Sequence, residues 1–237
     1  MSNYALRLPN GNTIEYKLER RQRKSVGMRI SPHGLIVHAP TRITLSQIEQ
    51  ALLSKADWIT KKLQDLREHL PDPFHWQDGA ELLLLGNAMT LSVQHDPRSR
   101  AVEYTPGLLN IALPKPEDEA AIARKVIQWY RKEALNDFGR RLQILAARLG
   151  ITTPDLFLSS ARARWGSCNS KREVRLNWRL IQAPPHIINY VICHELAHIK
   201  EMNHSPKFWA VVESICPDYK RAEKDLKSLS ARLHQLD

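Results

Sequence analysis

The sequence predicts an α+β fold in which a strand-rich N-terminal region precedes a second domain built from a helix packed on a small sheet. Strand-like and helix-like segments come in separate blocks, which is typical of α+β proteins. The chain has 237 residues, 43% hydrophobic and 25% charged, so it can bury an ordinary core. Pro114-Lys115-Pro116 is the strongest break between blocks. We therefore expect a region with one helix over 1–116 and a second domain over 117–237.

The N-terminal region is expected to begin with short strands. The runs 25–30 and 35–38 are strand-like, and turn-forming residues separate them at 32–34. Between 44 and 69 the apolar residues recur at helical spacing, so a single helix is expected there. Further strands are expected at 82–85, 90–94 and 108–113.

The second domain is expected to open with a long helix over 118–149. Apolar and polar residues then alternate with period two through 173–180, which indicates a strand that pairs with 163–167. Pro184 and Pro185 begin another helix, since proline is accepted in a first turn. The sequence shows no internal repeat and no low-complexity segment.

The charge balance bears on the partners of the protein. The formal net charge is +10, with a pI near 9.7. Such an excess attracts nucleic acid, anionic lipid or phosphorylated substrates. The basic run at 20–24 suggests a weak affinity for nucleic acid. The alternative is that lysine and arginine decorate solvent-exposed helix faces, because much of the excess is spread along the chain.

The cysteines and the hydropathy predict a cytoplasmic protein with no membrane partner. Cys168, Cys193 and Cys216 are an odd number in a long chain, so a disulfide framework is not expected. The first residues lack the pattern of a signal peptide, and no apolar run has the length that crosses a bilayer. These features leave the oligomeric state open.

The helix expected after residue 185 carries the clearest chemical signal, an H-E-x-x-H sequence that begins at His194. Residues four apart lie on one helix face, so the imidazoles of His194 and His198 leave that face one turn apart. That spacing suits two nitrogens bound to Zn²⁺ at about 2.0–2.1 Å. Glu195 lies about 100° round the helix. It therefore reaches beside the metal, where it can take a proton from a zinc-bound water.

His204 is the expected third ligand. It follows a predicted helix end at Asn203, because asparagine tolerates the left-handed conformation of a helix C-terminus. Three protein ligands leave a fourth position open for water, the arrangement of a catalytic zinc site. We therefore predict one Zn²⁺ per chain, held by His194, His198 and His204, with Glu195 as the catalytic base. The alternative is an ordinary packed helix whose histidines are satisfied within the core.

Several segments around this motif carry a family resemblance. They are residues 194–198, Asn203-His204-Ser205, Phe208-Trp209, Arg164-Trp165-Gly166-Ser167-Cys168 and Leu176-Asn177-Trp178. Together they resemble the YgjP-like metallopeptidase family, relatives of the WLM and Spartan-like zincins, most closely over 162–209. The resemblance implies a zincin-like catalytic domain with the ligands and base named above. The histidine spacing also equals that of metzincins, but Glu201 stands where those proteins have glycine.

Arg164, Trp165 and Gly166 are predicted to bind substrate. This segment is expected to form an edge strand above the site, and zincins bind an extended peptide by adding it to such a strand. Gly166 would allow the peptide backbone to approach closely. The alternative places Trp165 in the core and Arg164 in solvent. Phe208 and Trp209 are expected to lie beneath the metal in a structural role.

Two substrate classes remain open, so the expected partner is a peptide, a protein or a nucleotide. In peptide hydrolysis, Glu195 passes its proton to the leaving amine. In phosphoanhydride hydrolysis, the substrate is a nucleoside triphosphate, and some proteins that resemble this chain carry a nucleotide-pyrophosphatase label. Arginine and lysine side chains would then hold the phosphates. The candidates are Arg162, Arg164, Lys171, Arg172, Arg175 and Arg179. The first class is preferred, because the sequence has no glycine-rich phosphate loop.

Overall fold

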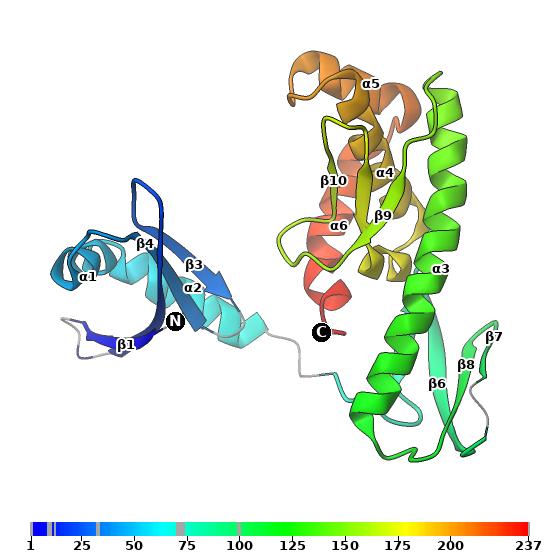
Figure 1. The fold of residues 1–237 in the computed structure, drawn as a ribbon, viewed down its shortest axis with the longest axis horizontal. Helices are drawn as coiled ribbons and strands as arrows, with labels where there is room; N and C mark the ends of the chain where they lie inside the picture. Colours follow the sequence, from blue (N-terminus) through cyan, green and yellow to red (C-terminus); the bar gives the residue numbers. More distant parts are fainter. Residues whose placement is uncertain are drawn as a thin grey trace. The chain divides into compact units, whose positions relative to one another are not determined.

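The chain forms two compact units, Met1–Asp72 and Pro73–Asp237, in a computed structural model (Figure 1). The structure describes residues 2–8, 11, 13–31, 34–69, 74–98 and 101–236. Residues 32 and 33 of the predicted turn lie outside the described residues. Helices and strands come in separate blocks in both units, so the predicted α+β class is confirmed.

The first unit is a four-stranded sheet followed by two helices. The strands are β1 (Ser2–Arg7), β2 (Thr13–Arg21), β3 (Gly27–Ser31) and β4 (Gly34–Pro40), and the helices are α1 (Leu45–Leu53) and α2 (Ala56–His69). Thr44 begins α1 with a capping box, since its hydroxyl accepts from Gln47 N and the Gln47 side chain accepts from Thr44 N. The helix predicted over 44–69 is therefore present, but it is interrupted at residues 54 and 55. The unit has its own apolar core, which includes Val37, Ile48 and Ile59.

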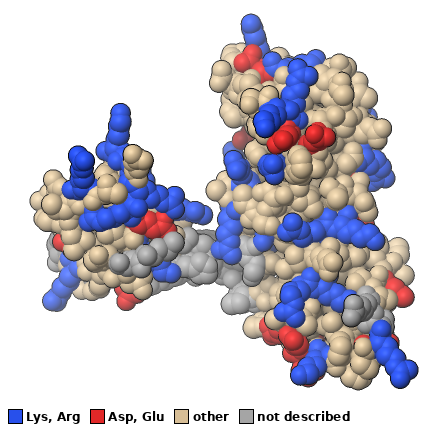
Figure 2. All heavy atoms as spheres, in the orientation of Figure 1, with Lys and Arg blue, Asp and Glu red and all other residues tan. Residues whose placement is uncertain are grey.

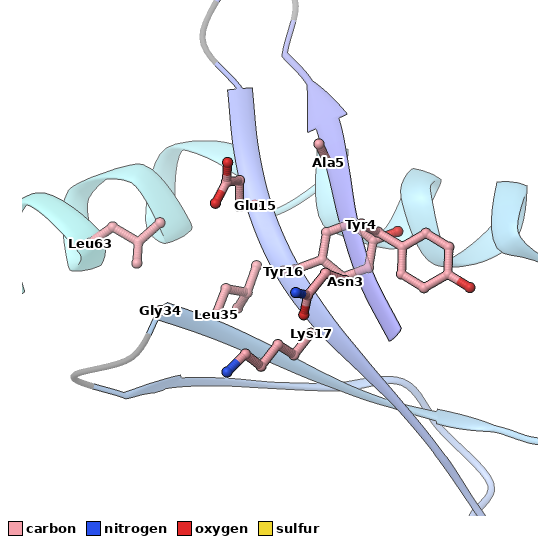
Figure 3. A pocket seen from close by; sticks show the side chains of 9 residues that line it. All are labelled: Asn3, Tyr4, Ala5, Glu15, Tyr16, Lys17, Gly34, Leu35 and Leu63. Atoms are coloured by element: carbon pink, nitrogen blue, oxygen red, sulfur yellow. The ribbon is translucent and has the colours of Figure 1, made fainter. Parts of the chain in front are cut away.

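A cavity of about 470 Å³ opens on the first unit (Figure 3). The rings of Tyr4 and Tyr16 stack beside it with centroids 5.5 Å apart. Burial raises the pKa of Tyr16, and among the described residues its hydroxyl has no hydrogen-bond partner. Asn3, Glu15 and Lys17 line the same cavity. None of these residues belongs to the predicted metal site.

The second unit begins with another four-stranded sheet, followed by one long helix. The elements are β5 (Glu81–Leu84), β6 (Asn87–His95), β7 (Val102–Thr105), β8 (Leu108–Leu113) and α3 (Glu119–Arg148). The strand order is β5-β6-β8-β7, and the order of the first sheet is β1-β2-β4-β3. Each sheet has two antiparallel outer pairs and one parallel central pair, β2 with β4 and β6 with β8. The two units therefore share a strand topology that no sequence repeat had indicated.

The domain boundary predicted between 116 and 117 falls inside the second unit, whereas the structure divides the chain between 72 and 73. The reason is a shared core. The hydroxyl of Tyr130 on α3 donates to Leu83 O at 2.7 Å, and Leu85 N donates to Ile181 O at 2.8 Å. The second sheet is thus bonded both to the long helix and to the segment around Ile181.

A three-stranded sheet and three helices complete the second unit. The strands are β9 (Leu156–Ser159), β10 (Gly166–Cys168) and β11 (Val174–Asn177), in the order β10-β11-β9. A short 3-10 helix, η1 (Trp178–Gln182), leads to α4 (Pro185–Lys200), α5 (Pro206–Ile215) and α6 (Tyr219–Leu233). Figure 1 shows α3 running along the whole second unit, and α4 contacts α3, α5, α6 and β10.

The strand predicted through residue 180 ends at Asn177. The side chain of Asn177 accepts a hydrogen bond from Arg179 N at 3.1 Å and donates to Ala161 O at 2.9 Å. This cap starts the 3-10 helix and turns Arg179 inward, so it does not lie on a polar strand face. Among the described residues, no helix combines the length and the apolar character that a membrane span requires.

Candidate metal centre

The H-E-x-x-H sequence lies on a helix, as predicted, in about the last two turns of α4. Pro185 occupies the first turn of this helix, and Ile188 and Ile192 bury one side of it in the core. The helix ends at Lys200, and its C-cap, Glu201, has an extended backbone. The predicted left-handed helix end at Asn203 is therefore wrong, because positive φ among non-glycine residues of the described chain occurs only at Leu85 and Arg172. The chain nevertheless turns back after residue 201.

This turn brings His204 to the face of α4 that carries His194 and His198. Each of the three side chains offers a ring nitrogen, and these nitrogens all lie within 4.8 Å of one another. The Nε2 atoms of His194 and His204 are 3.0 Å apart. The cluster can therefore hold a metal ion, and three imidazoles form a donor set that suits a divalent transition metal.

The electrostatics of the cluster favour neutral imidazoles, the form that binds a metal. Burial, followed by the neighbouring His198 and His204, lowers the pKa of His194 to about 4. Burial is also the main cause that lowers the pKa of His198. Both rings thus keep a lone pair free at neutral pH, so no proton has to leave them before a cation binds.

Aromatic side chains of α5 form the floor of the cluster. The Phe208 ring lies 4.6–4.9 Å from all three histidine rings, measured between centroids, and Trp209 contacts His194 and His204. Ser205 begins α5, since its hydroxyl accepts from Phe208 N at 3.4 Å. The predicted structural role of Phe208 and Trp209 is confirmed by these contacts.

Glu195 lies beside the cluster and is almost fully buried, with 5% of its surface exposed. Burial raises the pKa of its carboxyl group to about 8, and the nearby Arg164 guanidinium opposes this shift. Among the described residues, Oε2 has no hydrogen-bond partner. Glu195 is therefore a desolvated carboxyl group with a free oxygen, the type of group that serves in general acid–base catalysis.

The three predicted substrate-binding residues occupy different environments. Gly166 faces Glu195 so closely that a Cβ at this position would lie 2.7 Å from Glu195 Cγ. Arg164 is exposed near the carboxylate. Trp165 is half-buried, packs on the core and stacks on His234 with centroids 4.5 Å apart. These contacts favour the alternative interpretation of Trp165 as a packing residue.

The structure also adds a residue that the sequence had not indicated. Glu223 of α6 lies close enough to His194 for its charge to raise the pKa of that ring, and it pairs with Lys227 Nζ at 2.9 Å. Glu223 lies far from the motif along the chain, so no local pattern points to it. Cys168 on β10, which ends the segment 164–168 of the family resemblance, also lies near the site: burial, then the charge of Glu195, raises the pKa of its thiol.

The predicted phosphate-binding arginines do not form one group. Arg175 is exposed, lies over the Phe157 ring and pairs with Glu173 at 3.4 Å. Arg179 is 6% exposed and lies over the Trp178 ring, 4.5 Å from its centroid. Burial, then the charges of Arg162 and Arg131, lowers the pKa of Arg179 to about 10. Arg162 and Arg131 therefore lie near enough to Arg179 for their charges to act on it.

Positive charge is also widely distributed on the surface. On the face drawn in Figure 2, lysine and arginine side chains occur along the whole second unit and on several sides of the first. Acidic side chains are interspersed among them. This distribution agrees with the expectation that much of the basic excess decorates solvent-exposed faces.

Comparisons with known proteins place these observations in a family context. The family described as YgjP-like, metallopeptidase domain, matches residues 24–229. The chain is similar to UTP pyrophosphatase of Escherichia coli strain K12, with 27% identity over 90 residues, which is 38% of this chain and 51% of that protein. The chain thus spans about half the length of the curated relative that it matches.

Two solved structures of archaeal metallopeptidase zymogens resemble a part of the fold. Abylysin of Pyrococcus abyssi matches with a TM-score of 0.36 and 21% identity, over 39% of this chain and 94% of that one. Jannalysin of Methanocaldococcus jannaschii matches with a TM-score of 0.33 and 22% identity, over 39% and 96%. Since the family match extends over most of the sequence and includes all three clustered histidines, the chain belongs to the YgjP-like metallopeptidase domain family.

Proposed function

We propose that this protein is a zinc-dependent metallopeptidase, with His194, His198 and His204 as ligands of one Zn²⁺ ion. The observation that carries the proposal is the convergence of three ring nitrogens beside the buried carboxyl group of Glu195. Imidazole ligands favour zinc over magnesium or calcium, and three protein ligands are typical of catalytic zinc sites. When bound, such an ion supplies Lewis acidity, which polarises a carbonyl oxygen and acidifies water.

Glu195 is the proposed proton carrier. A cation in the histidine cluster favours the ionised carboxylate, opposing the burial that raises its pKa to about 8. The free Oε2 can then accept a proton from water and deliver it to the leaving amine of the peptide. Gly166 keeps the space in front of this carboxylate clear, because any side chain there would collide with it.

The peptide is proposed to bind alongside β10. This strand is at the edge of its sheet, where it pairs with β11, and it contacts the metal-binding helix α4. An extended peptide can add to such an edge through its main-chain groups, independently of its side chains. Arg164 lies where it can hold a peptide carbonyl or carboxylate near Glu195.

Metal analysis and a protease assay test this proposal together. We expect the purified protein to contain one zinc ion per chain and to cleave denatured casein. Glu195→Gln should keep the zinc and lose at least about 10²-fold in turnover, whereas His198→Ala should lose the zinc. Full turnover by Glu195→Gln would exclude the proposed base, and normal zinc content in His198→Ala would exclude the proposed ligands.

A second candidate activity is hydrolysis of a nucleoside triphosphate to a monophosphate and pyrophosphate. It is favoured by a group of arginines, in which the charges of Arg162 and Arg131 act on Arg179, and by the name of the curated relative, UTP pyrophosphatase. One guanidinium group can donate two parallel hydrogen bonds to a phosphate group, so several arginines suit a polyphosphate.

Pyrophosphate release from each of the four nucleoside triphosphates tests this second activity. We expect Arg162→Gln to raise KM for the nucleotide, and higher ionic strength to do the same, because salt screens the phosphate contacts. Arg98→Gln, an exposed substitution in the loop after β6, is the matched control and should leave KM unchanged. If the protein cleaves casein but hydrolyses no nucleotide, the second activity is excluded and only the peptidase proposal remains.

A further inference from the structure

The sheet of the first unit has one face that its helices leave exposed. Successive residues of a strand point to opposite faces of a sheet. In β2, Tyr16 and Leu18 pack in the same core as α1 and α2, whereas Lys17 between them is exposed. In β3, Arg29 is exposed in the same way, between two partly buried residues of that core. Lys17 and Arg29 therefore lie on the face opposite the helices.

The strand register brings these two cations close together. Lys17 is opposite Ile36 of the parallel neighbour β4, and Ile36 is opposite Arg29 of the antiparallel neighbour β3. Two strand spacings, about 10 Å, therefore separate the backbones of Lys17 and Arg29. The half-buried side chain of Ile36 lies between them.

The next row of the same face holds two more arginines. His38 of β4 is opposite Glu19 of β2 on one side and Gly27 of β3 on the other. The Arg23 guanidinium lies against Gly27, where a Cβ would be 2.6 Å from Arg23 Nη2. Arg21 pairs with Glu19. We call the surface formed by Lys17, Arg21, Arg23 and Arg29 the basic face.

Acidic groups neutralise only a part of this charge. Glu15 and Glu19 are the only acidic residues in the first 43 positions of the chain. Glu19 is already engaged, since it pairs with Arg21 and its Oε2 lies 3.2 Å from Nδ1 of His38. The first unit carries half of the net charge of +10 in less than a third of the chain. The basic face is therefore a concentration of positive charge on a unit that is itself cationic.

The structure divides the basic run at 20–24 between the two faces of the sheet. Nη1 of Arg20 donates to three carbonyl oxygens at the end of β4 and in the connection to α1, at 2.7–3.2 Å. Arg20 thus stabilises the fold on the helix side of the sheet. Arg21 and Arg23 instead belong to the basic face, where their charges can act on a ligand.

The size and the chemistry of the basic face indicate its partner. Lys17 and Arg21 are four residues apart on β2, which corresponds to about 13 Å along the strand. A single phosphate group cannot span this distance, so the complementary ligand is a polyanion. The large exposed apolar side chains described in the first unit, Leu45, Leu53 and Trp58, belong to α1 and α2. The described part of the basic face therefore offers no such side chain for insertion into a lipid bilayer.

We propose that the basic face binds the phosphate backbone of a single-stranded nucleic acid, independently of the proposed peptidase activity. A single strand is flexible, so its successive phosphates can adjust to cations that are fixed on a sheet. Arginine and lysine bind phosphate oxygens through charge-assisted hydrogen bonds. Many single-strand binders also stack bases on aromatic rings, but the described part of this face carries no exposed phenylalanine, tyrosine or tryptophan. The binding is therefore electrostatic and independent of base sequence.

Fluorescence anisotropy of the full-length protein with a labelled thymidine strand of about 20 nucleotides tests this proposal. The affinity should fall steeply as salt rises, because binding releases counterions. Lys17→Gln combined with Arg29→Gln removes two phosphate contacts and should weaken binding on the order of tenfold near about 0.1 M salt. The slope of log affinity against log salt should become shallower by about 1.4. Both side chains are exposed, so the melting temperature should stay that of the wild-type protein.

The matched control removes the same charge from the helical segment of the same unit. Lys55 and Lys61 are exposed there. Lys55→Gln combined with Lys61→Gln should keep the affinity within about twofold of the wild-type value, because salt screens charges that do not contact the strand. Three results would each overturn the proposal. They are an equal loss of affinity in both double variants, unchanged affinity in the variant of the basic face, and binding to phosphatidylserine vesicles but not to the oligonucleotide.

Discussion

At the scale of single residues, the candidate site depends on a close approach between a glycine and a carboxyl group. Gly166 lies against Glu195, because the atoms nearest to a Cβ at this position all belong to the Glu195 side chain. Glu195 is also nearly buried, so it cannot retreat toward solvent. The identity of residue 166 therefore controls the position of the proposed base, although residue 166 carries no functional group of its own.

Replacement of this glycine gives a direct prediction. In Gly166→Ala the new methyl group would lie 2.7–2.8 Å from Glu195 Cγ and Cδ, so the carboxyl group must shift. A displacement of about 1 Å in a catalytic group costs on the order of 10²-fold in rate, and we expect a loss of that size with zinc content unchanged.

The matched control for this substitution is Gly139→Ala on α3. A Cβ at residue 139 has no neighbour nearer than Leu156 Cδ2 at 4.0 Å, and alanine favours the helix by about 0.5–1 kcal/mol. Gly139→Ala should therefore raise the free energy of unfolding and leave turnover unchanged. Wild-type turnover in Gly166→Ala would show that Glu195 is positioned by other contacts.

His234 provides a pH-dependent prediction. Burial, then the charges of Arg179 and Arg162, lowers its pKa from 6.5 to about 4. Between these values the unfolded chain binds a proton that the folded chain does not, so the free energy of unfolding falls as the pH drops through this window. Above the window the ring is neutral in both states, so His234 no longer makes the stability depend on pH.

We expect His234→Phe to retain the ring stack on Trp165 and to lose less stability than the wild-type protein between pH 7 and pH 5. Urea denaturation at the two pH values measures the difference. His95→Phe, an exposed substitution on β6, should follow the wild-type decline. Equal declines in the wild-type protein and in His234→Phe would contradict the assignment.

At the scale of elements, the candidate metal centre depends on how α4 ends and α5 begins. The chain leaves α4 at Lys200 and enters α5 at Ser205, and His204 lies in the short connection between them. The N-cap hydroxyl of Ser205 holds the first turn of α5, whose Phe208 contacts all three histidine rings. A helix start thus positions both a ligand and the floor beneath it.

Removal of the Ser205 cap should weaken metal binding by the histidine cluster. We expect Ser205→Ala to lower the free energy of unfolding by about 1 kcal/mol and to weaken zinc binding as well. Asp118→Ala removes the cap of α3, where Asp118 accepts from Ala121 N at 2.9 Å, and should cost a similar stability without affecting zinc. Chelator competition measures the affinity of each variant, and equal zinc affinities would contradict the proposed coupling.

The same elements show what sequence reasoning can and cannot supply. Histidines four apart on an amphipathic helix, with proline in its first turn, predicted α4 and two of the clustered rings, because helical geometry is local. The strand expected through residue 180 ends earlier, at Asn177. The alternation of apolar and polar residues continues beyond this point, but the side-chain cap of Asn177 ends the strand. The position of Glu223 near His194 could not be predicted, because it depends on tertiary packing between distant segments.

At the scale of the whole molecule, the chain divides after the first sheet and its helices. The proline-rich segment at 114–116 had suggested a later boundary, but β5, β6 and β8 contribute to the same core as α3 and α4. A proline-rich segment marks a break in secondary structure. A domain boundary is instead a place where few packing contacts cross, so only the packing shows where the units separate.

Truncation distinguishes the two boundaries. We expect residues 73–237 expressed alone to fold cooperatively and to bind one zinc ion, because the core that supports α4 is complete within them. Residues 117–237 should fail to fold, since they lack the sheet to which Tyr130 and Ile181 are bonded. Circular dichroism during heating and zinc analysis report both results. A folded, zinc-binding 117–237 fragment would restore the boundary that the sequence suggested.

The matching strand orders of the two sheets have a consequence for biosynthesis. In each sheet the two central strands are parallel and are separated in the sequence by one strand: β3 comes between β2 and β4, and β7 between β6 and β8. Until the second strand of the pair has been made, β2 and β6 therefore each have an unpaired edge. Tandem modules of like topology are prone to exchange strands with each other during folding. Because the sequences of the two sheets differ, we expect each newly made strand to pair within its own unit.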